Sequence, residues 1–311
     1  MIYIQTPKRE AAFYFALEDL LLKAKGDYLL LWSVPPTIMV GRYQNIYEEM
    51  NAKRAREDGV AMIRRHTGGG AIYTNEHSLQ YSVITDNDAI DFRCYLEPVV
   101  KALKKLGVNV EYNSRNDLAI EQLKISGSAQ CVANRRLLHH GSLLYDMDFE
   151  EMTRYLTPPD YKMKSKGIKS VRQRVTNIRP HLPHEWTLDE FKHYLESELD
   201  VDRVVTLTPE MIHAIEEKMV DYEDIQEHQP AFNVVRRNKF AGGFLEMNAD
   251  IQKDIIQQIH FSGDIFAGDG VEAFEQGFIG KSLNEVPEYL AQTDIPFYDI
   301  TKEDIQSLFE L

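Results

Sequence analysis

Apolar side chains recur at one-sided helical spacing in two stretches of the first half of the chain. In residues 9–25 the spacing runs through Phe13, Leu17, Leu20, Leu21 and Ala24. In residues 92–106, which Gly107 follows, it runs through Leu96, Val99, Val100, Leu103 and Leu106. Both stretches are therefore predicted to form helices that bury one face.

Short apolar runs bounded by turn residues predict strands around these helices. They lie at residues 28–34, 37–40, 60–65, 71–74, 80–85, 117–120, 124–129 and 137–145. Further helices are predicted at residues 52–58, after the capping-box pattern that begins at Thr187, and after Thr208-Pro209. Strands that follow strands, with helices placed irregularly among them, indicate an α+β fold of mixed, largely antiparallel sheets flanked by helices.

An acidic, polar segment between Val220 and Lys239 interrupts this pattern and contains Pro230. Beyond it, residues 240–266 predict a strand meander, and short helices follow to the end of the chain. We predict a large domain of residues 1–230 and a small C-terminal α+β accessory domain of residues 238–311. About seventy residues is small for an independent domain, so we expect it to dock on the large one.

Composition and charge narrow the class of protein. Of 311 residues, 43% are hydrophobic, which is ample for a buried core, and the formal net charge of −14 argues against a nucleic-acid partner recognised by bulk charge. Only two cysteines occur, so no disulfide framework is expected. No stretch has the apolar run of a signal peptide or a membrane span, and we expect a cytoplasmic protein without a membrane partner.

The first candidate for chemistry is Arg64-Arg65-His66-Thr67-Gly68-Gly69-Gly70-Ala71, between two predicted strands. Glycines allow positive φ and close approach of a ligand, so their N–H groups can converge on phosphate oxygens. The two arginines can add charge-assisted hydrogen bonds to a phosphate or carboxylate. A flexible turn is the alternative interpretation, and the motif alone leaves both open.

The second candidate is Lys124-Ile125-Ser126-Gly127-Ser128-Ala129, on a predicted strand. A lysine among small residues can reach a ligand that lies on the sheet. When a carboxylate attacks the α-phosphorus of ATP, negative charge builds up, and a fixed ammonium group stabilises it. The alternative interpretation is a surface lysine on an edge strand.

Two further patterns are more ambiguous. His139 and His140 are adjacent on a predicted strand and should point to opposite faces, so the pair does not predict a metal site. Residues 161–174 carry six basic side chains and no acidic one. That stretch is either a solvated loop or a site for a polyanion such as a nucleotide phosphate.

Together and in this order, the motifs resemble those of the lipoate-protein ligases, within the biotin and lipoate attachment family. The resemblance is close over most of the first 200 residues and looser beyond them. The matching segments are Pro35-Pro36-Thr37-Ile38, Gly41-Arg42-Tyr43-Gln44-Asn45, residues 64–71, Arg115-Asn116-Asp117-Leu118, residues 124–129, residues 139–144, residues 166–172 and Arg174-Val175-Thr176-Asn177.

The resemblance implies a two-step reaction by a monomeric enzyme. Lipoate and Mg-ATP first give lipoyl-AMP and pyrophosphate, and a lysine of an acceptor lipoyl domain then takes the acyl group. The implied acceptors are the glycine-cleavage H protein and the acyltransferase subunits of 2-oxoacid dehydrogenases. Lys124 matches the family's essential lysine, which implies that it holds the carboxylate and the α-phosphate.

The same resemblance assigns the other site residues. The residues implied to bind lipoate or lipoyl-AMP are Arg65, Thr67, Gly68, Gly69, Gly70, Tyr73, Asn116, Asp117, Gly127, Ala129 and His140. Among them, Ala129 and His140 are implied to line the acyl pocket, and Asp117 to bind Mg²⁺ and orient Lys124. The residues implied to belong to the loop that closes over the adenylate are Lys166, Gly167, Ser170 and Val171.

Two departures leave the acyl preference open. Ser78 stands where the family usually has asparagine, and Cys131 stands where some ligases carry arginine. An acyltransferase of the same family, which moves octanoyl or lipoyl groups through a thioester, is the main alternative and needs a cysteine nucleophile. The segment before Lys124 has no cysteine, and Cys131 matches neither position used by those transferases. A lipoate-binding protein without activity and a biotin ligase are the remaining alternatives.

Overall fold

The computed structural model describes residues 1–45, 49–156, 174–222 and 232–310. Contacts between Cα atoms divide the chain into two compact units. The first comprises Met1–Met39, Tyr47–Arg64 and Ala71–Ile225, and the second comprises Val40–Ile46, Arg65–Gly70 and Gln226–Leu311. Two short internal stretches thus belong, by their contacts, with the C-terminal part. The boundary between residues 230 and 238 drawn from the sequence stays a prediction.

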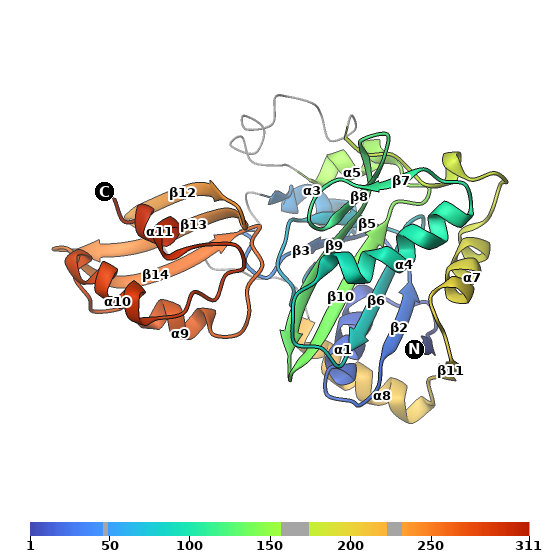
Figure 1. Cartoon of the computed structure of the whole chain (residues 1–311), viewed down its shortest axis with the longest axis horizontal. Coiled ribbons are helices and arrows are strands. Elements are labelled where there is room, and N and C mark those ends of the chain that lie inside the picture. The colour runs from blue at the N-terminus through green and yellow to red at the C-terminus, as the bar shows by residue number, and fades with distance from the viewer. Residues whose placement is uncertain (46–48, 157–173, 223–231, 311) are drawn as a thin grey trace. The chain divides into compact units, whose positions relative to one another are not determined.

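An eight-stranded sheet forms the centre of the first unit, with the order β11-β1-β2-β6-β10-β9-β8-β7 (Figure 1). Its strands are β1 (Ile2–Gln5), β2 (Tyr28–Trp32), β6 (Leu79–Thr85), β7 (Val110–Tyr112), β8 (Asp117–Ile120), β9 (Leu123–Ala133), β10 (Arg136–Leu143) and β11 (Arg203–Thr206). Only β1 pairs in parallel, with β2 and β11, and the other pairings are antiparallel. The prediction of a mixed, largely antiparallel α+β fold is confirmed.

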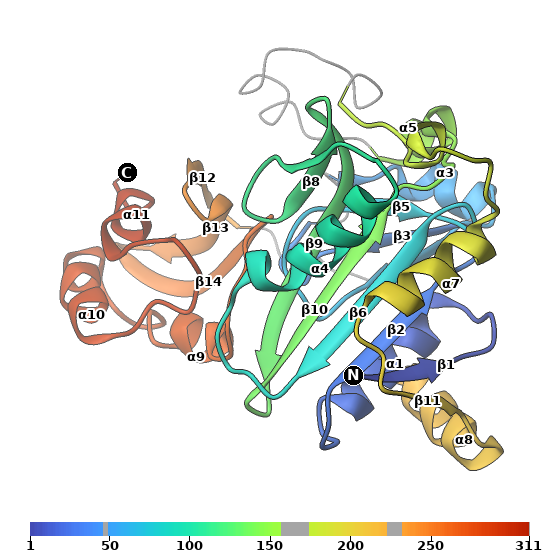
Figure 2. The same cartoon turned by 45° about the vertical axis from the view of Figure 1, so that its right-hand side comes forward.

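Helices cover both faces of this sheet (Figures 1 and 2). On one face, α1 (Ala11–Leu21) packs on Leu30, Ile84 and Leu138, and α8 (Pro209–Lys218) with the 3₁₀ turn η3 (Met219–Tyr222) lies against α1. On the other face lie α4 (Phe92–Lys105) and α7 (Leu188–Glu198). The capping box of Thr187 and Glu190 is present at the start of α7, as predicted.

A smaller three-stranded sheet with the order β4-β3-β5 completes the first unit's framework. Its strands are β3 (Thr37–Val40), β4 (Ala61–Arg64) and β5 (Ile72–Thr74). The remaining elements of this part are α3 (Ala52–Glu57), α5 (Phe149–Tyr155) and the 3₁₀ turn η2 (Arg179–His181). The Tyr73 ring of β5 contacts the Tyr155 ring of α5 at a tilt, with ring centroids 5.2 Å apart, so α5 packs against this sheet.

The second unit contains the antiparallel sheet β12 (Val234–Phe240), β13 (Gly243–Gln252) and β14 (Ile255–Gly263). The helical segments that follow are α9 (Val271–Gln276), η4 (Leu283–Glu285), α10 (Val286–Gln292) and α11 (Lys302–Ser307). Met247 and Phe261, both fully buried, lie in the core of this unit, and Tyr43 joins that core. Within the described ranges, no helix has the length and apolar character needed to cross a bilayer.

Candidate active site

A cavity of about 440 Å³ opens in the first unit where β5, β8, β9, β10 and α5 meet. One part of its wall is polar and carries Asp117, Lys124 and Arg174; another part is apolar and carries Leu144, Met152 and Leu156. The other lining residues are Glu49, Ala71, Ile72, Tyr73, Asn113, Gln122, Gly127, Ser142 and Val175. A wall of this kind can accommodate a ligand with one charged and one apolar part.

Lys124 and Asp117 form an ion pair in this cavity, with Nζ 2.8 Å from Oδ1. The pairing follows from the strands, since Asp117 of β8 lies opposite Gly127 of β9. Gly127 has no side chain, and an added Cβ would lie only 2.8 Å from Nζ of Lys124. The absence of a side chain at Gly127 therefore provides the space that the ammonium group occupies.

The hairpin that carries this pair has an irregular geometry. Glu121 and Gln122, between β8 and β9, both have positive φ, as a tight two-residue turn requires. The register shifts between Leu118 and Ala119. Asn116 stabilises the same hairpin. Its Nδ2 donates to the Ser128 carbonyl oxygen over 2.8 Å, and the Ser128 hydroxyl donates to the Asn116 carbonyl oxygen over 2.9 Å. Through these two hydrogen bonds Asn116 stabilises the hairpin that carries the ion pair.

Ala129 and His140 face each other on β9 and β10, two residues along from the pair of Gly127 and Ser142. Because side chains alternate along a strand, all four positions share one face of the sheet. His140 is buried, and its Nδ1 lies 3.2 Å from Oε1 of Glu18. The structure thus places the two residues predicted for the acyl pocket side by side, next to a buried carboxylate.

Sequence analysis missed Glu18, the centre of a buried polar chain beneath α1. The Ser82 hydroxyl donates to Oε1 of Glu18 over 2.6 Å, and Trp32 Nε1 donates to the Ser82 hydroxyl over 2.9 Å. Glu18 is 3% exposed. An acidic residue on the apolar face of a predicted helix was the available signal, because a buried carboxylate needs hydrogen-bond partners.

His139 lies on the opposite face from His140, as the strand alternation predicts. Its Nε2 is 3.1 Å from the Tyr81 hydroxyl, and its Nδ1 is 2.8 Å from Nε2 of Gln130. Burial, with a smaller effect of His140, lowers the pKa of His139 to about 3. His139 is therefore a neutral core residue under α4, where Tyr95 stacks on its ring.

The glycine-rich segment packs closely within the second unit. Gly69 N–H donates to the Ile265 carbonyl oxygen over 3.1 Å, and a Cβ at Gly68 would lie 2.0 Å from that oxygen. Gly69 has a φ of +90°. Nη2 of Arg65 donates to the carbonyl oxygens of Gly68 (3.0 Å) and Gly70 (2.6 Å).

The glycines thus allow backbone to approach backbone. The Thr67 carbonyl oxygen accepts from Arg42 N–H, which ties the segment to the other internal stretch of the second unit. Arg65 and Thr67 are both buried. Whether the loop also binds an adenylate stays a prediction. Lys166, Gly167, Ser170 and Val171 lie outside the described residues, while Arg174, just after them, lines the cavity.

The two departures from the family pattern are Ser78, which is buried, and Cys131, which is half-buried. The Ser78 hydroxyl lies 2.5 Å from the Thr74 hydroxyl, and Gln80 Nε2 donates to both, over 3.2 and 2.8 Å. Ser78 thus completes a buried hydroxyl–amide cluster. Cys131, half-buried on β9, packs against the apolar core beneath α1, opposite Leu138.

The residues that could hold a metal are few. The part of the chain that the structure describes brings together no group of three His, Cys, Asp or Glu side chains suited to a metal ion. Asp117 Oδ1 is buried, and its partner within that part is the Lys124 ammonium group, 2.8 Å away. Mg²⁺ commonly binds through one or two carboxylates together with substrate phosphates, and Asp117 fits that pattern.

Comparison with known proteins places this chain in a family. Residues 10–200 match the model of the lipoyl protein ligase A/B catalytic domain, and residues 229–309 match that of the bacterial lipoate protein ligase C-terminus. Lipoate-protein ligase LplJ of Bacillus subtilis is 33% identical over 304 residues, which cover 92% of each chain.

Two solved structures share the fold. LipL1 of P. falciparum, in complex with lipoate, superposes with a TM-score of 0.77 at 20% identity, over 99% of this chain and 98% of its own. A lipoate-protein ligase A bound with ATP superposes with a TM-score of 0.59 at 22% identity, over 70% of this chain and 93% of its own. By its sequence and its two matched regions, the chain belongs to the lipoate-protein ligase family.

Proposed function

We propose that the chain is an ATP-dependent lipoate-protein ligase, which makes lipoyl-AMP from lipoate and Mg-ATP and transfers the lipoyl group to a lysine of an acceptor lipoyl domain. The observation that carries the proposal is the ion pair of Lys124 and Asp117 beside Gly127, in a cavity that Leu144, Met152 and Leu156 also line. Family membership and the relatives solved with lipoate and with ATP support it.

In the first step, a lipoate carboxylate oxygen attacks the α-phosphorus of ATP. A new O–P bond forms, the bond from the α-phosphorus to the bridging oxygen breaks, and pyrophosphate leaves. The Lys124 ammonium lies beside the charge that builds up at the α-phosphate and stabilises it. When bound, Mg²⁺ would be held by Asp117 and would neutralise phosphate charge.

In the second step, the amine of the acceptor lysine attacks the acyl carbon of lipoyl-AMP. A C–N bond forms, the bond from the acyl carbon to the phosphate oxygen breaks, AMP leaves, and the amine loses a proton. The Lys124 ammonium group keeps its contact with the phosphate, so AMP departs as a stabilised anion. The apolar wall of Leu144, Met152 and Leu156 supports a place for the uncharged part of the ligand.

The strand register supports a path for the acyl chain. From Gly127, beside Lys124, to Ala129 is two residues of extended strand, which span about 7 Å along the sheet. We assign Ala129 and His140 to the acyl pocket. To the adenylate we assign Arg65, Thr67, Gly68, Gly69, Gly70, Tyr73 and Asn116, together with the loop of Lys166, Gly167, Ser170 and Val171.

The partners and setting follow from this chemistry. We assign the glycine-cleavage H protein and the acyltransferase subunits of 2-oxoacid dehydrogenases as acceptors, and the cytoplasm as the compartment because it supplies ATP. We further propose that the enzyme acts as a monomer. The thioester transferase finds no support in the geometry, since neither Cys94 nor Cys131 lines the cavity.

Pyrophosphate release tests the proposal. Purified protein with Mg-ATP is given lipoate, octanoate or biotin without acceptor, and the wild type is compared with Lys124→Ala. We expect release that depends on lipoate and a loss of about 100-fold or more in the variant. Lipoate-independent release, or an active and folded Lys124→Ala protein, contradicts the mechanism. Addition of each acceptor protein in turn then identifies the acceptor by the gain in mass of one lipoyl group.

A further inference from the structure

The segment Arg174–Asn177 contributes Arg174 and Val175 to the cavity wall, and it also holds the backbone of Lys124. Lys124 N–H donates to the Arg174 carbonyl oxygen over 2.8 Å, and Thr176 N–H donates to the Lys124 carbonyl oxygen over 3.0 Å. Together they form a parallel bridge between Lys124 and Val175. On its other edge, Lys124 pairs with Ala119 of β8.

The bridge replaces a strand that has ended. β10 ends at Leu143, which lies opposite Ser126 of β9. One further hydrogen bond joins Leu144 N–H to the Ile125 carbonyl oxygen over 2.8 Å, so the pairing stops one residue short of Lys124. The Arg174–Thr176 segment occupies the edge that β10 leaves. The backbone from which the Lys124 side chain projects is therefore held on both sides, although only β8 belongs to the main sheet at that point.

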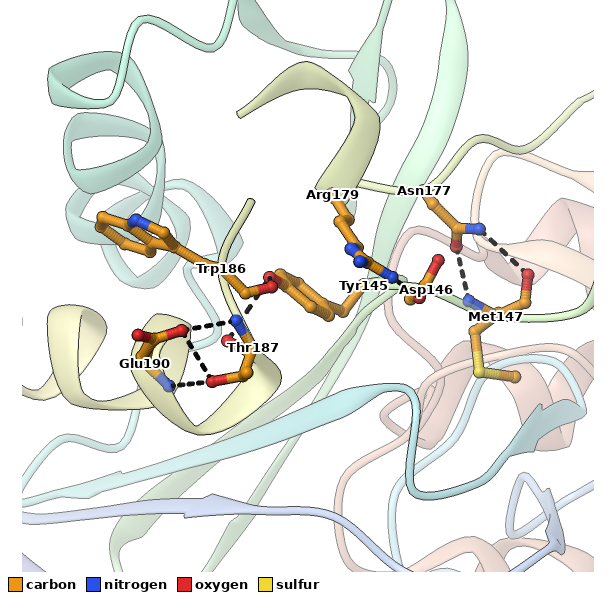
Figure 3. Close-up of polar contacts among 8 residues, drawn as sticks. All are labelled: Tyr145, Asp146, Met147, Asn177, Arg179, Trp186, Thr187 and Glu190. Atoms are coloured by element: carbon orange, nitrogen blue, oxygen red, sulfur yellow. Dashed lines mark hydrogen bonds and ion pairs between the residues drawn. The ribbon is translucent and has the colours of Figure 1, made fainter. Parts of the chain in front are cut away.

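Asn177 anchors this segment to the chain just after β10 (Figure 3). Met147 N–H donates to Asn177 Oδ1 over 2.9 Å, and Asn177 Nδ2 donates to the Met147 carbonyl oxygen over 3.0 Å. One carboxamide thus satisfies both backbone groups of a single residue, whereas a methyl group offers neither a donor nor an acceptor. Ile178 N–H then donates to the Leu144 carbonyl oxygen over 2.7 Å.

We propose that Asn177 is a positioning residue for Lys124: its double hydrogen bond to Met147 holds the Arg174–Thr176 segment against the Lys124 backbone. Asn177 acts through that segment and touches neither the ammonium group nor the cavity. The proposal rests on the proposed function, because the position of the ammonium group matters for the rate only if that group stabilises a reacting phosphate. A misplacement of about 1 Å in such a group costs roughly 100-fold in rate.

The choice of side chain makes the proposal specific. Alanine at position 177 removes both hydrogen bonds. Aspartate keeps the acceptor for Met147 N–H but turns a charged oxygen toward the Met147 carbonyl oxygen. When that carboxyl group is protonated, its O–H can donate in place of Nδ2, and the original pattern returns. Asn177→Asp should therefore recover activity, relative to wild type, as the pH is lowered.

The matched control is Arg179→Gln, two residues along the same segment. The Arg179 side chain pairs with Asp146 at 2.5 Å, but the two side chains are 41% and 40% exposed (Figure 3). An exposed pair of this kind contributes little. The charged and titratable groups nearest to Asn177 along these segments are Arg174, Arg179 and His181 on its own segment and Tyr145, Asp146 and Asp148 around Met147. Each variant is compared with wild type at the same pH, so that the titration of these groups, which both proteins share, cancels in the ratio.

The experiment measures lipoate-dependent pyrophosphate release and amide hydrogen exchange in wild type, Asn177→Ala, Asn177→Asp and Arg179→Gln. We expect kcat to fall about 10- to 100-fold in Asn177→Ala with little change in the KM for lipoate, and Arg179→Gln to stay within about twofold of wild type. Exchange at Lys124 and Thr176 should be faster in Asn177→Ala. The ratio of Asn177→Asp to wild type should rise between pH about 7.5 and about 5.5.

Each result either supports or overturns the positioning role of Asn177. Unchanged kcat in a folded Asn177→Ala protein, or unchanged exchange at Lys124, overturns the positioning role. If Asn177→Ala fails to fold, a constant Asn177→Asp ratio across pH overturns it instead. A wild-type protein without lipoate-dependent release refutes the proposed function, whereas the exchange measurement still shows whether Asn177 holds the Lys124 backbone.

Discussion

Alanine at position 127 would place a methyl carbon 2.8 Å from Nζ and 3.0 Å from Cε of Lys124. Ordinary contacts of such atoms begin near 3.4 Å, so the ammonium group must move by about 0.6 Å or more. The backbone at Gly127 does not have a positive φ, so alanine fits there without strain. The substitution therefore displaces one side-chain group and leaves the strand intact.

We expect a small effect on the free energy of unfolding and a large effect on kcat. Lys124 is 38% exposed and flexible, so the free energy of unfolding should change by less than about 1 kcal/mol. A misplaced catalytic group costs far more in rate than in stability. We expect kcat for lipoate-dependent pyrophosphate release to fall about 10- to 100-fold, which corresponds to about 1.4–2.7 kcal/mol of transition-state stabilisation.

The assay compares Gly127→Ala, Lys124→Ala and the double variant. If Gly127→Ala acts through the ammonium group, the double variant should be no slower than Lys124→Ala, since groups in contact are not additive. Urea unfolding followed by tryptophan fluorescence provides the stability control, because Trp32 and Trp186 both lie in the first unit. Wild-type kcat in Gly127→Ala, or full additivity in the double variant, would refute the reasoning.

Three further outcomes are expected. Burial lowers the pKa of His139 to about 3 in the folded protein, whereas the unfolded chain titrates near 6.5 at this residue. The neutral histidine therefore contributes its full stability above pH 6.5, and this contribution declines as the pH falls toward 3. At pH 5 the loss in the free energy of unfolding is about 2 kcal/mol. His139→Gln should remove that decline in urea titrations at pH 7.5 and pH 5, and an equal decline in both proteins would exclude His139 as its source. Gly68→Ala brings a methyl group 2.0 Å from the Ile265 carbonyl oxygen and should destabilise the second unit by about 1–3 kcal/mol. The measurement is amide hydrogen exchange, which should become faster in residues 232–310. Gly70→Ala is the control, because a Cβ at Gly70 has nothing within 4 Å. Cys131→Ser should change ligase activity less than about twofold, and a loss of 100-fold would point to a thioester route.

Local patterns predicted the elements well where one face of an element is buried. The spacing from Leu96 to Leu106 located α4, whose observed bounds are Phe92–Lys105. The capping-box pattern at Thr187 located the start of α7. The helix predicted over residues 9–25 ends earlier, at Leu21, because hydrophobic spacing continues beyond the last helical hydrogen bonds.

Contacts between distant segments were not predictable in the same way. Glu18 lies 122 residues from His140 in sequence, and nothing near it indicates that a buried histidine is its partner. Asn177 is 30 residues from Met147, and a carboxamide gives no local sign of the backbone that it binds. Motifs located Lys124 and Asp117, whereas the segment that supports Lys124 became visible only when the sheet register was known.

The second unit is built from three separate stretches of chain, so a single truncation cannot remove all of it. A polypeptide that ends at residue 225 keeps Val40–Ile46 and Arg65–Gly70 but loses the strands that those stretches contact. Tyr43 would lose the core in which it is buried, and Gly69 N–H would lose its acceptor at Ile265. A separately expressed C-terminal fragment would offer those missing surfaces. Cutting the chain in the 223–231 region should therefore yield two fragments that recombine when mixed, as in a split protein, rather than two domains that fold and work alone.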